Sequence, residues 1–144
     1  MAKPTCKSVS ALQILVVDDN DEFAHLFAKL LNDEGHLVET ACDGPAALDA
    51  IHRTAPDVVF LDVGLPTMNG YEVAKRIRGE LGLDKITLIA VTGYGGHIDK
   101  LRAKDAGFNG HLLKPTDFQL VKLIDALQQR IELSGRFHRI KGNG

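Results

Sequence analysis

The chain has 144 residues, a length that suits one domain with a substantial core. Hydrophobic residues make up 44% of it, charged residues 25%, and the formal net charge is −2, as in an ordinary soluble globular protein. This balance lacks the basic excess of a nucleic-acid binder, and no apolar run approaches the ~20 residues of a membrane-spanning helix. The N-terminus has no apolar signal-peptide core and the two cysteines form no Cys-x-x-Cys pair, so we expect a cytoplasmic protein without a disulfide.

Apolar runs of strand length alternate with segments of helical period along the whole chain. In order, we expect a strand at 14–17, a helix from Asp21 to about Gly35, a strand at 37–41, a helix at 44–53, a strand at 58–61, a helix at 69–80, a strand at 87–91, a helix at 97–106, a strand at 110–113 and a helix at about 120–131. This alternation is typical of βαβ units, and it predicts a single α/β domain with a doubly wound, five-stranded parallel sheet and five helices. We place the domain at 12–131, with an N-terminal tail at 1–11 and a C-terminal tail at 132–144.

Polar groups follow four of the predicted strands directly. Asp18 and Asp19 follow the first strand, Asp62 the third, Thr92 the fourth and Lys114 the fifth. Each alone has a modest explanation as a turn, cap or surface residue. Because parallel strands bring their carboxyl ends to one edge of a sheet, where ligands bind, the combination predicts a site.

The residue types at this edge suit phosphoryl transfer. Three close carboxylates repel one another, and a hard divalent cation such as Mg²⁺ removes that difficulty. Lys114 adds a second positive charge, and a hydroxyl can orient a phosphoryl oxygen. An aspartate can itself be the nucleophile, and Asp62 is the best placed, because Asp18 and Asp19 form a natural metal-binding pair.

With these residues, the chain resembles the receiver domains of two-component response regulators, of the kind found in chemotaxis regulators, over about residues 12–131. The resemblance is carried by the segments ILVVDDN, PDVVFLDVGLPTMNGYEVAKRIR, LIAVTGYG and AGFNGHLLKP. It implies a flavodoxin-like fold with the strand order 2-1-3-4-5. It also implies that Asp62 is the phosphoacceptor and that Asp18, Asp19, Asp62 and the backbone carbonyl of Gly64 hold Mg²⁺.

The same resemblance assigns roles to residues of the fourth and fifth strands. Thr92 would hydrogen-bond the phosphoryl group and act as a switch residue, and Lys114 would pair with the phosphoryl group. The Lys114–Pro115 peptide bond would be cis. Gly64 and Tyr94 occupy the positions that tune phosphoryl lifetime, and shielding by Tyr94 predicts slow self-dephosphorylation.

His111 departs from the family pattern, which has Tyr or Phe as the switch residue on the fifth strand. An imidazole could make a similar inward swing, or His111 could be a partly exposed polar residue on an edge strand. We expect the remaining histidines to lie at the surface: His25, His36, His52, His97 and His138.

The resemblance implies a signalling switch rather than a conventional enzyme. A histidine kinase or phosphotransfer protein would phosphorylate Asp62, and the chain would catalyse its own phosphorylation and dephosphorylation. A downstream protein would read the face formed by 97–106, 110–113 and 120–131, and this face could support a phosphorylation-dependent dimer. We expect no direct nucleic-acid or membrane contact, and either a stand-alone regulator or a receiver from a hybrid histidine kinase.

Three other classes are weighed against this reading. An aspartyl-phosphate phosphohydrolase usually has a second aspartate two residues after the nucleophile, where this chain has Gly64. A flavodoxin-like cofactor binder needs a phosphate loop after the first strand, and DDND would repel phosphate without a metal. An interaction module that only keeps the fold tends to lose one of the acids, the Thr or the Lys, and all are present.

Overall fold

The structure, a computed structural model, describes residues 11–79, 85–92 and 100–113. Within them, strands and helices alternate without exception, as the sequence predicts. The strands are β1 (Gln13–Val17), β2 (Leu37–Ala41), β3 (Val58–Asp62), β4 (Thr87–Thr92) and β5 (Gly110–Leu113). The helices are α1 (Asp21–Asp33), α2 (Gly44–Thr54), α3 (Gly70–Gly79) and α4 (Lys100–Ala106). The helix expected at about 120–131 lies outside the described residues.

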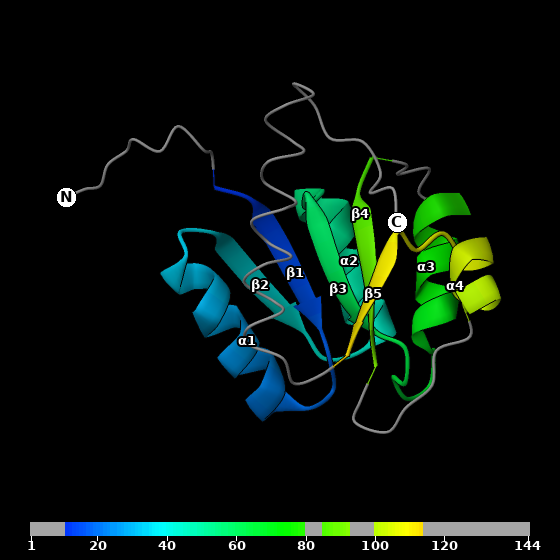
Figure 1. Cartoon of the computed structure of the whole chain (residues 1–144), viewed down its shortest axis with the longest axis horizontal. Helices are drawn as coiled ribbons and strands as arrows, with labels where there is room; N and C mark the ends of the chain where they lie inside the picture. The colour runs from blue at the N-terminus through cyan, green and yellow to red at the C-terminus, as the bar shows by residue number, and fades with distance from the viewer. Residues whose placement is uncertain (1–10, 80–84, 93–99, 114–144) are drawn as a thin grey trace.

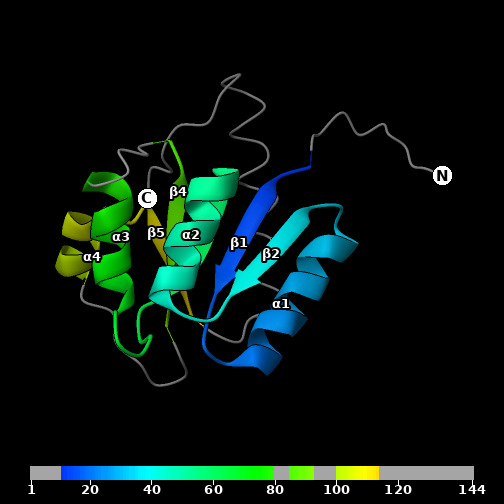
Figure 2. The same cartoon turned by 180° about the vertical axis from the view of Figure 1, so that it is seen from behind.

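All strands of the sheet are parallel and follow the order β2-β1-β3-β4-β5, which confirms the predicted doubly wound fold. Figures 1 and 2 show α1 on one side of the sheet and α2 and α3 on the other, with α4 beside α3. The crossover helices therefore place every strand's carboxyl end at the same edge.

The core consists of two apolar clusters, one on each face of the sheet. Alternate residues of β1 and β3 divide between them, as the period of two in a strand requires. Leu15 and Leu61 join the cluster under α2 and α3, whereas Val16 and Phe60 join the cluster under α1. Every residue of β3 is buried, including the aspartate at its end. Aspartate side chains are seldom buried without a partner, so this burial needs an explanation.

Helices α1, α2 and α3 each begin with a side-chain cap close to the carboxyl edge of the sheet, and at α3 Asn69 Oδ1 accepts a hydrogen bond from the Glu72 amide at 3.0 Å. Asn20 accepts a hydrogen bond from the Phe23 amide at the start of α1, and Asp43 caps α2. Gly35, at φ +98°, follows the end of α1 as predicted. Ala55 ends α2 at φ +45°, a left-handed conformation that glycine adopts at lower cost. These caps fix where each loop at the site edge ends.

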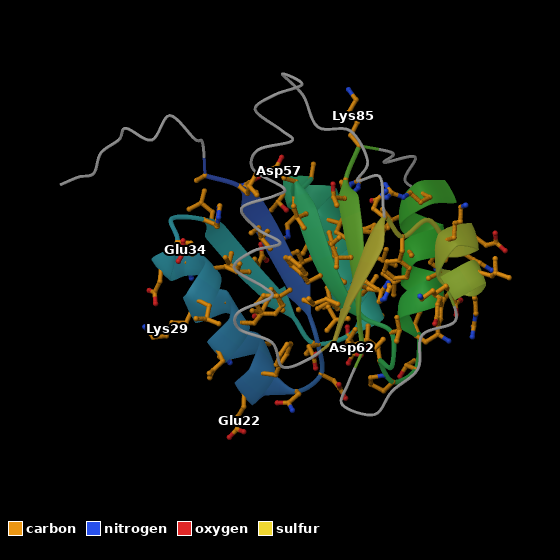
Figure 3. The ribbon with its side chains drawn as sticks, in the orientation of Figure 1. Glu22, Lys29, Glu34, Asp57, Asp62 and Lys85 are labelled. Atoms are coloured by element: carbon orange, nitrogen blue, oxygen red, sulfur yellow. The ribbon has the colours of Figure 1, made fainter. Side chains whose placement is uncertain are left out.

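The opposite edge of the sheet is held by structural polar contacts. Asp57 lies there, at the other end of β3 from Asp62 (Figure 3), and accepts a hydrogen bond from the Gln13 amide at 2.9 Å. On the outer surface, Arg53 of α2 pairs with Glu39 and Asp49, and these hydrogen bonds raise the pKa of its guanidinium. Exposed pairs of this kind add little to stability.

One expectation about the histidines is wrong. His36 is 3% exposed, and its Nδ1 accepts a hydrogen bond from the Leu12 amide at 3.1 Å. His36 follows Gly35 and comes directly before β2. Its imidazole nitrogen takes the place of a carbonyl oxygen from a neighbouring strand as the acceptor for the Leu12 amide. His25 and His52 are exposed, as expected, and His97 and His138 lie outside the described residues.

In the described part of the chain, no helix has the length and apolar character needed to cross a membrane.

Candidate functional site

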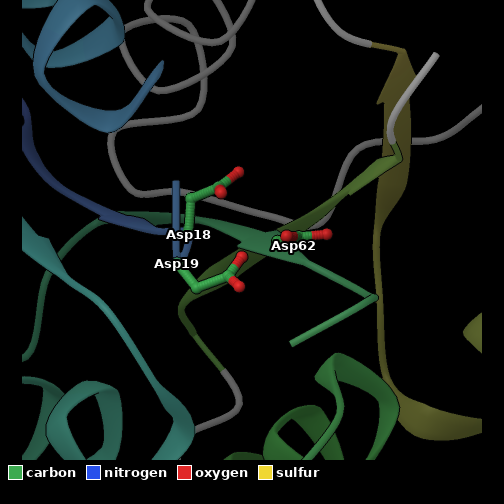
Figure 4. Close-up of side chains that lie close together, drawn as sticks. All are labelled: Asp18, Asp19 and Asp62. Atoms are coloured by element: carbon green, nitrogen blue, oxygen red, sulfur yellow. The ribbon is translucent and has the colours of Figure 1, made fainter. Parts of the chain in front are cut away.

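Three carboxylates converge at the carboxyl ends of β1 and β3. Val17 pairs with Leu61, so Asp18 and Asp62 come next on the two neighbouring strands, and Asp19 follows Asp18. Each aspartate offers an oxygen that lies within 4.8 Å of the others, and Figure 4 shows the three side chains gathered there. The sequence placed Asp62 just beyond its strand. The structure makes it the last residue of β3.

The two inner carboxylates are held by the backbone that follows them. The Asn20 amide donates to Asp18 Oδ1 at 2.8 Å, and the Gly64 amide donates to Asp62 Oδ1 at 2.9 Å. In both cases the donor lies two residues after the aspartate, which is the arrangement of an Asx turn. Each hydrogen bond stabilises the charged carboxylate and limits its rotation.

The arrangement fits a hard divalent cation. Asp18 is 1% exposed and Asp62 is 7% exposed, while Asp19 is open to solvent. Buried carboxylates at this spacing repel one another and lose hydration, and both costs fall when a cation lies between them. The donor set is made of oxygen atoms with one solvent-facing member, which suits an ion that keeps several water ligands, as Mg²⁺ does.

The loop between β3 and α3 is fixed against the site by close packing. The Gly70 amide donates to the Val63 carbonyl at 3.1 Å, and a Cβ at position 70 would lie 2.6 Å from the Asp62 carbonyl oxygen. Leu65 is buried, and Met68 packs against Gly44 at the start of α2. The sequence predicts only that a helix over 69–80 includes Gly70. Its contact with the backbone of Asp62 has no sequence signal beyond the glycine itself.

Thr92 completes the described part of the predicted site. It is the last residue of β4 and 4% exposed, and it lies one residue beyond Val91, the partner of Asp62 in the β3–β4 register. Figure 1 shows that β3 and β4 end at the same edge. The sheet thus brings Thr92 to the aspartates, as the alternation of strands and helices predicted.

Other predicted site residues have different outcomes. His111 lies on β5, opposite Ala90, and is exposed, which agrees with the edge-strand alternative and leaves its switch role a prediction. Gly64 is exposed, and a role for its carbonyl in metal binding also stays a prediction. Tyr94, Lys114 and Pro115 lie outside the described residues.

Comparison with known proteins identifies relatives over most of the chain. Residues 14–128 match the family "Response regulator receiver domain". The chain is 34% identical over 119 residues to an uncharacterised 14.6 kDa protein of Leptolyngbya boryana, and the alignment covers 82% of this chain and 91% of that protein. It is 35% identical over 126 residues to the transcriptional regulatory protein TcrA of Mycobacterium tuberculosis, with 87% of this chain covered but only 49% of TcrA.

The fold has close counterparts among solved structures. A putative response regulator from Chloroflexus aurantiacus superimposes with a TM-score of 0.75 and 30% sequence identity, over 84% of this chain and all of the other.

Proposed function

Because the chain belongs to the family of response regulator receiver domains, we propose that it is a phosphoacceptor switch of a two-component system. Asp62 takes a phosphoryl group from a histidine kinase or a phosphotransfer protein. The observation that carries this proposal is the meeting of Asp18, Asp19 and Asp62 at the ends of adjacent strands, with an oxygen from each within 4.8 Å of the others.

The chemistry follows from the residues at this edge. A carboxylate oxygen of Asp62 attacks the phosphorus atom and forms an acyl phosphate, while the bond from phosphorus to the donor nitrogen or oxygen breaks. The donor leaves with the bonding electron pair and takes up a proton. Mg²⁺, held by Asp18, Asp19, Asp62 and the Gly64 carbonyl, supplies neutralising charge for the phosphoryl oxygens.

Two further residues act on the phosphoryl group in this proposal. Thr92 donates a hydrogen bond to one of its oxygens, and Lys114 pairs with another. Tyr94 shields the acyl phosphate from water, which gives slow self-dephosphorylation. Asp62 is buried, and this limits the approach of water from the sheet side.

The output is a change in binding. Phosphorylation adds charge at the sheet edge, and Thr92 and Lys114 move toward it. The face formed by α4, β5 and the predicted helix at about 120–131 then shifts between two populations. A downstream protein reads this face, and a second copy of the chain is a further candidate to bind there.

A receiver fold that no longer accepts phosphoryl groups is the main competing function. Intact-protein mass after incubation with acetyl phosphate and Mg²⁺ separates the two. We expect one phosphoryl adduct in the wild type and in Asp49→Asn, a surface control, and none in Asp62→Asn or after EDTA is added first. No adduct in the wild type under any metal condition would refute phosphoacceptor function. An adduct retained in Asp62→Asn would refute the assignment of the site.

A further inference from the structure

One arginine of α3 holds the turn that joins α4 to β5. Arg78 donates through Nε and Nη2 to the Gly107 carbonyl, at 3.1 and 2.9 Å, and through Nη2 to Asn109 Oδ1 at 2.9 Å. The groups are part-buried, and hydrogen bonds from a charged donor are about twice as strong as neutral ones. Figures 1 and 2 both show α3 and α4 side by side, so the arginine bridges two neighbouring helical segments.

The turn is shaped to receive this side chain. Gly107 has φ +108°, which disfavours any residue with a Cβ. A Cβ at position 107 would also lie 2.5 Å from Arg78 Cγ. Glycine is therefore required at position 107 for two reasons: the positive φ, and the space that the aliphatic part of the Arg78 side chain occupies.

Asn109 links Arg78 to the sheet through two hydrogen bonds with Leu88 of β4. Its amide donates to the Leu88 carbonyl at 2.7 Å, and its Oδ1 accepts a hydrogen bond from the Leu88 amide at 2.8 Å. The side-chain oxygen thus replaces a strand carbonyl and extends the β4–β5 ladder by one step before Gly110, which pairs with Ile89. Since Arg78 donates to the same oxygen, it fixes the asparagine in the orientation that this pairing needs.

The register of β5 against β4 determines which residue lies opposite Thr92 at the site edge. β5 has four residues, and its register places Leu113 opposite Thr92. Lys114 is the next residue in the sequence. A slip of one residue would shift β5 by about 3.3 Å along β4 and exchange the two faces of the sheet on which its side chains lie.

Apolar packing and the arginine together anchor α4 and the turn that follows it. Of its seven residues, Ala103 and Ala106 are buried, and Leu101 is 76% exposed. Phe108, within the turn, is 8% exposed and packs edge-on against Tyr71 of α3, with ring centroids 6.2 Å apart. Apolar packing thus holds the position of the turn, while the hydrogen bonds of Arg78 hold the orientation of Asn109.

We propose that Arg78 is a positioning residue for phosphoryl chemistry: it fixes Asn109 in the α4–β5 turn, and thereby the register of β5, the strand that Lys114 follows directly in the sequence. This inference rests on the proposed function of Asp62. Arg78 belongs to the end of α3 that is remote from Gly70, and in this proposal it acts through the turn.

The test compares Arg78→Met, which keeps an unbranched apolar stem but removes the donors, with Arg76→Met. Arg76 lies on the same helix and forms an exposed ion pair with Glu72 at 3.6 Å. We expect the rate of adduct formation with acetyl phosphate at saturating Mg²⁺ to fall by between about tenfold and about a hundredfold in Arg78→Met, as for a misplaced catalytic group. The rate in Arg76→Met should match the wild type.

Mg²⁺ affinity distinguishes positioning from general disruption. The proposed metal ligands lie directly after β1, at the end of β3 and in the loop after β3. The Mg²⁺ dissociation constant of Arg78→Met should therefore equal that of the wild type at a temperature where both are fully folded. Asn109→Asp, which keeps an acceptor oxygen, should retain most of the wild-type rate. Asn109→Leu should lose as much as Arg78→Met.

Three results would overturn the inference: a wild-type rate in Arg78→Met, an equal loss of Mg²⁺ affinity and rate, or equal rates in the two Asn109 variants. Amide hydrogen exchange gives a readout that does not depend on phosphorylation, because the Leu88 and Asn109 amides should lose protection in Arg78→Met and not in Arg76→Met. If the wild type forms no adduct, the proposed function and the phosphoryl part of this inference both fail. The exchange data then decide whether Arg78 sets the register at all.

Discussion

Because Gly70 lies close to the end of β3, we predict that Gly70→Ala destabilises the protein. A Cβ there would lie 2.6 Å from the Asp62 carbonyl oxygen, 2.7 Å from Val63 Cα and 3.1 Å from the Asp62 carbonyl carbon. All three are backbone atoms, so no side-chain rotation can make room. Either α3 or the end of β3 must shift, and overpacking of this kind costs about 1–3 kcal/mol of stability.

Gly79, at the other end of α3, is the matched control. No atom of the described residues lies within 4 Å of a Cβ built there, so Gly79→Ala should be neutral or gain up to about 1 kcal/mol from helix propensity. Urea denaturation without metal measures both changes. Because the shift in Gly70→Ala moves the backbone that carries Asp62, its Mg²⁺ affinity should also fall by at least about tenfold.

Equal free energies of unfolding for Gly70→Ala and Gly79→Ala would refute this prediction. It also fails if Gly70→Ala loses stability while its Mg²⁺ affinity stays at the wild-type value, because the strain would then not reach Asp62.

Three other changes have expected outcomes that chemical and thermal denaturation can check. Thr87 is fully buried and its Oγ1 has no hydrogen-bond partner in the described part of the chain, so Thr87→Val should gain about 1 kcal/mol. Thr54→Val, which loses a hydrogen bond to a backbone carbonyl at 2.9 Å, should show no such gain. Ala55→Gly should gain about 1 kcal/mol, because φ is +45° there, and a loss would contradict the left-handed cap. Asp18→Asn should stabilise the metal-free protein by removing one of three clustered charges, yet abolish the rise in Tm that Mg²⁺ gives the wild type; a rise equal to that of the wild type would refute a role in metal binding.

The fold could be predicted from the sequence because its signals are local. Unbroken apolar runs such as 58–61 mark strands buried on both faces, and the described strand bounds differ from the expected ones by at most one residue. This one-residue difference concerns Asp62 and Thr92, which are the last residues of β3 and β4 and not the residues that follow these strands. Hydrophobicity alone ends a strand at its last apolar residue, whereas the sheet continues pairing through the polar one.

The three aspartates could be predicted because parallel strands bring their carboxyl ends to one edge. Contacts across the sequence could not be predicted. We expected His36 at the surface because no second histidine lies at a ligand spacing from it, but its acceptor role depends on the Leu12 amide, 24 residues earlier. No local pattern singles out Arg78, because its partners lie 29 and 31 residues away.

The central claim is that Asp62 carries the phosphoryl group, and the most direct test locates the acyl phosphate in the sequence. Borohydride reduces an acyl phosphate to an alcohol and thereby converts the modified aspartate to homoserine, which peptide mass mapping can place. After treatment with acetyl phosphate and Mg²⁺, the account predicts homoserine at position 62 alone. Homoserine at Asp18 or Asp19 with none at Asp62 would contradict it, because the metal-binding pair and the phosphoacceptor would then be wrongly assigned.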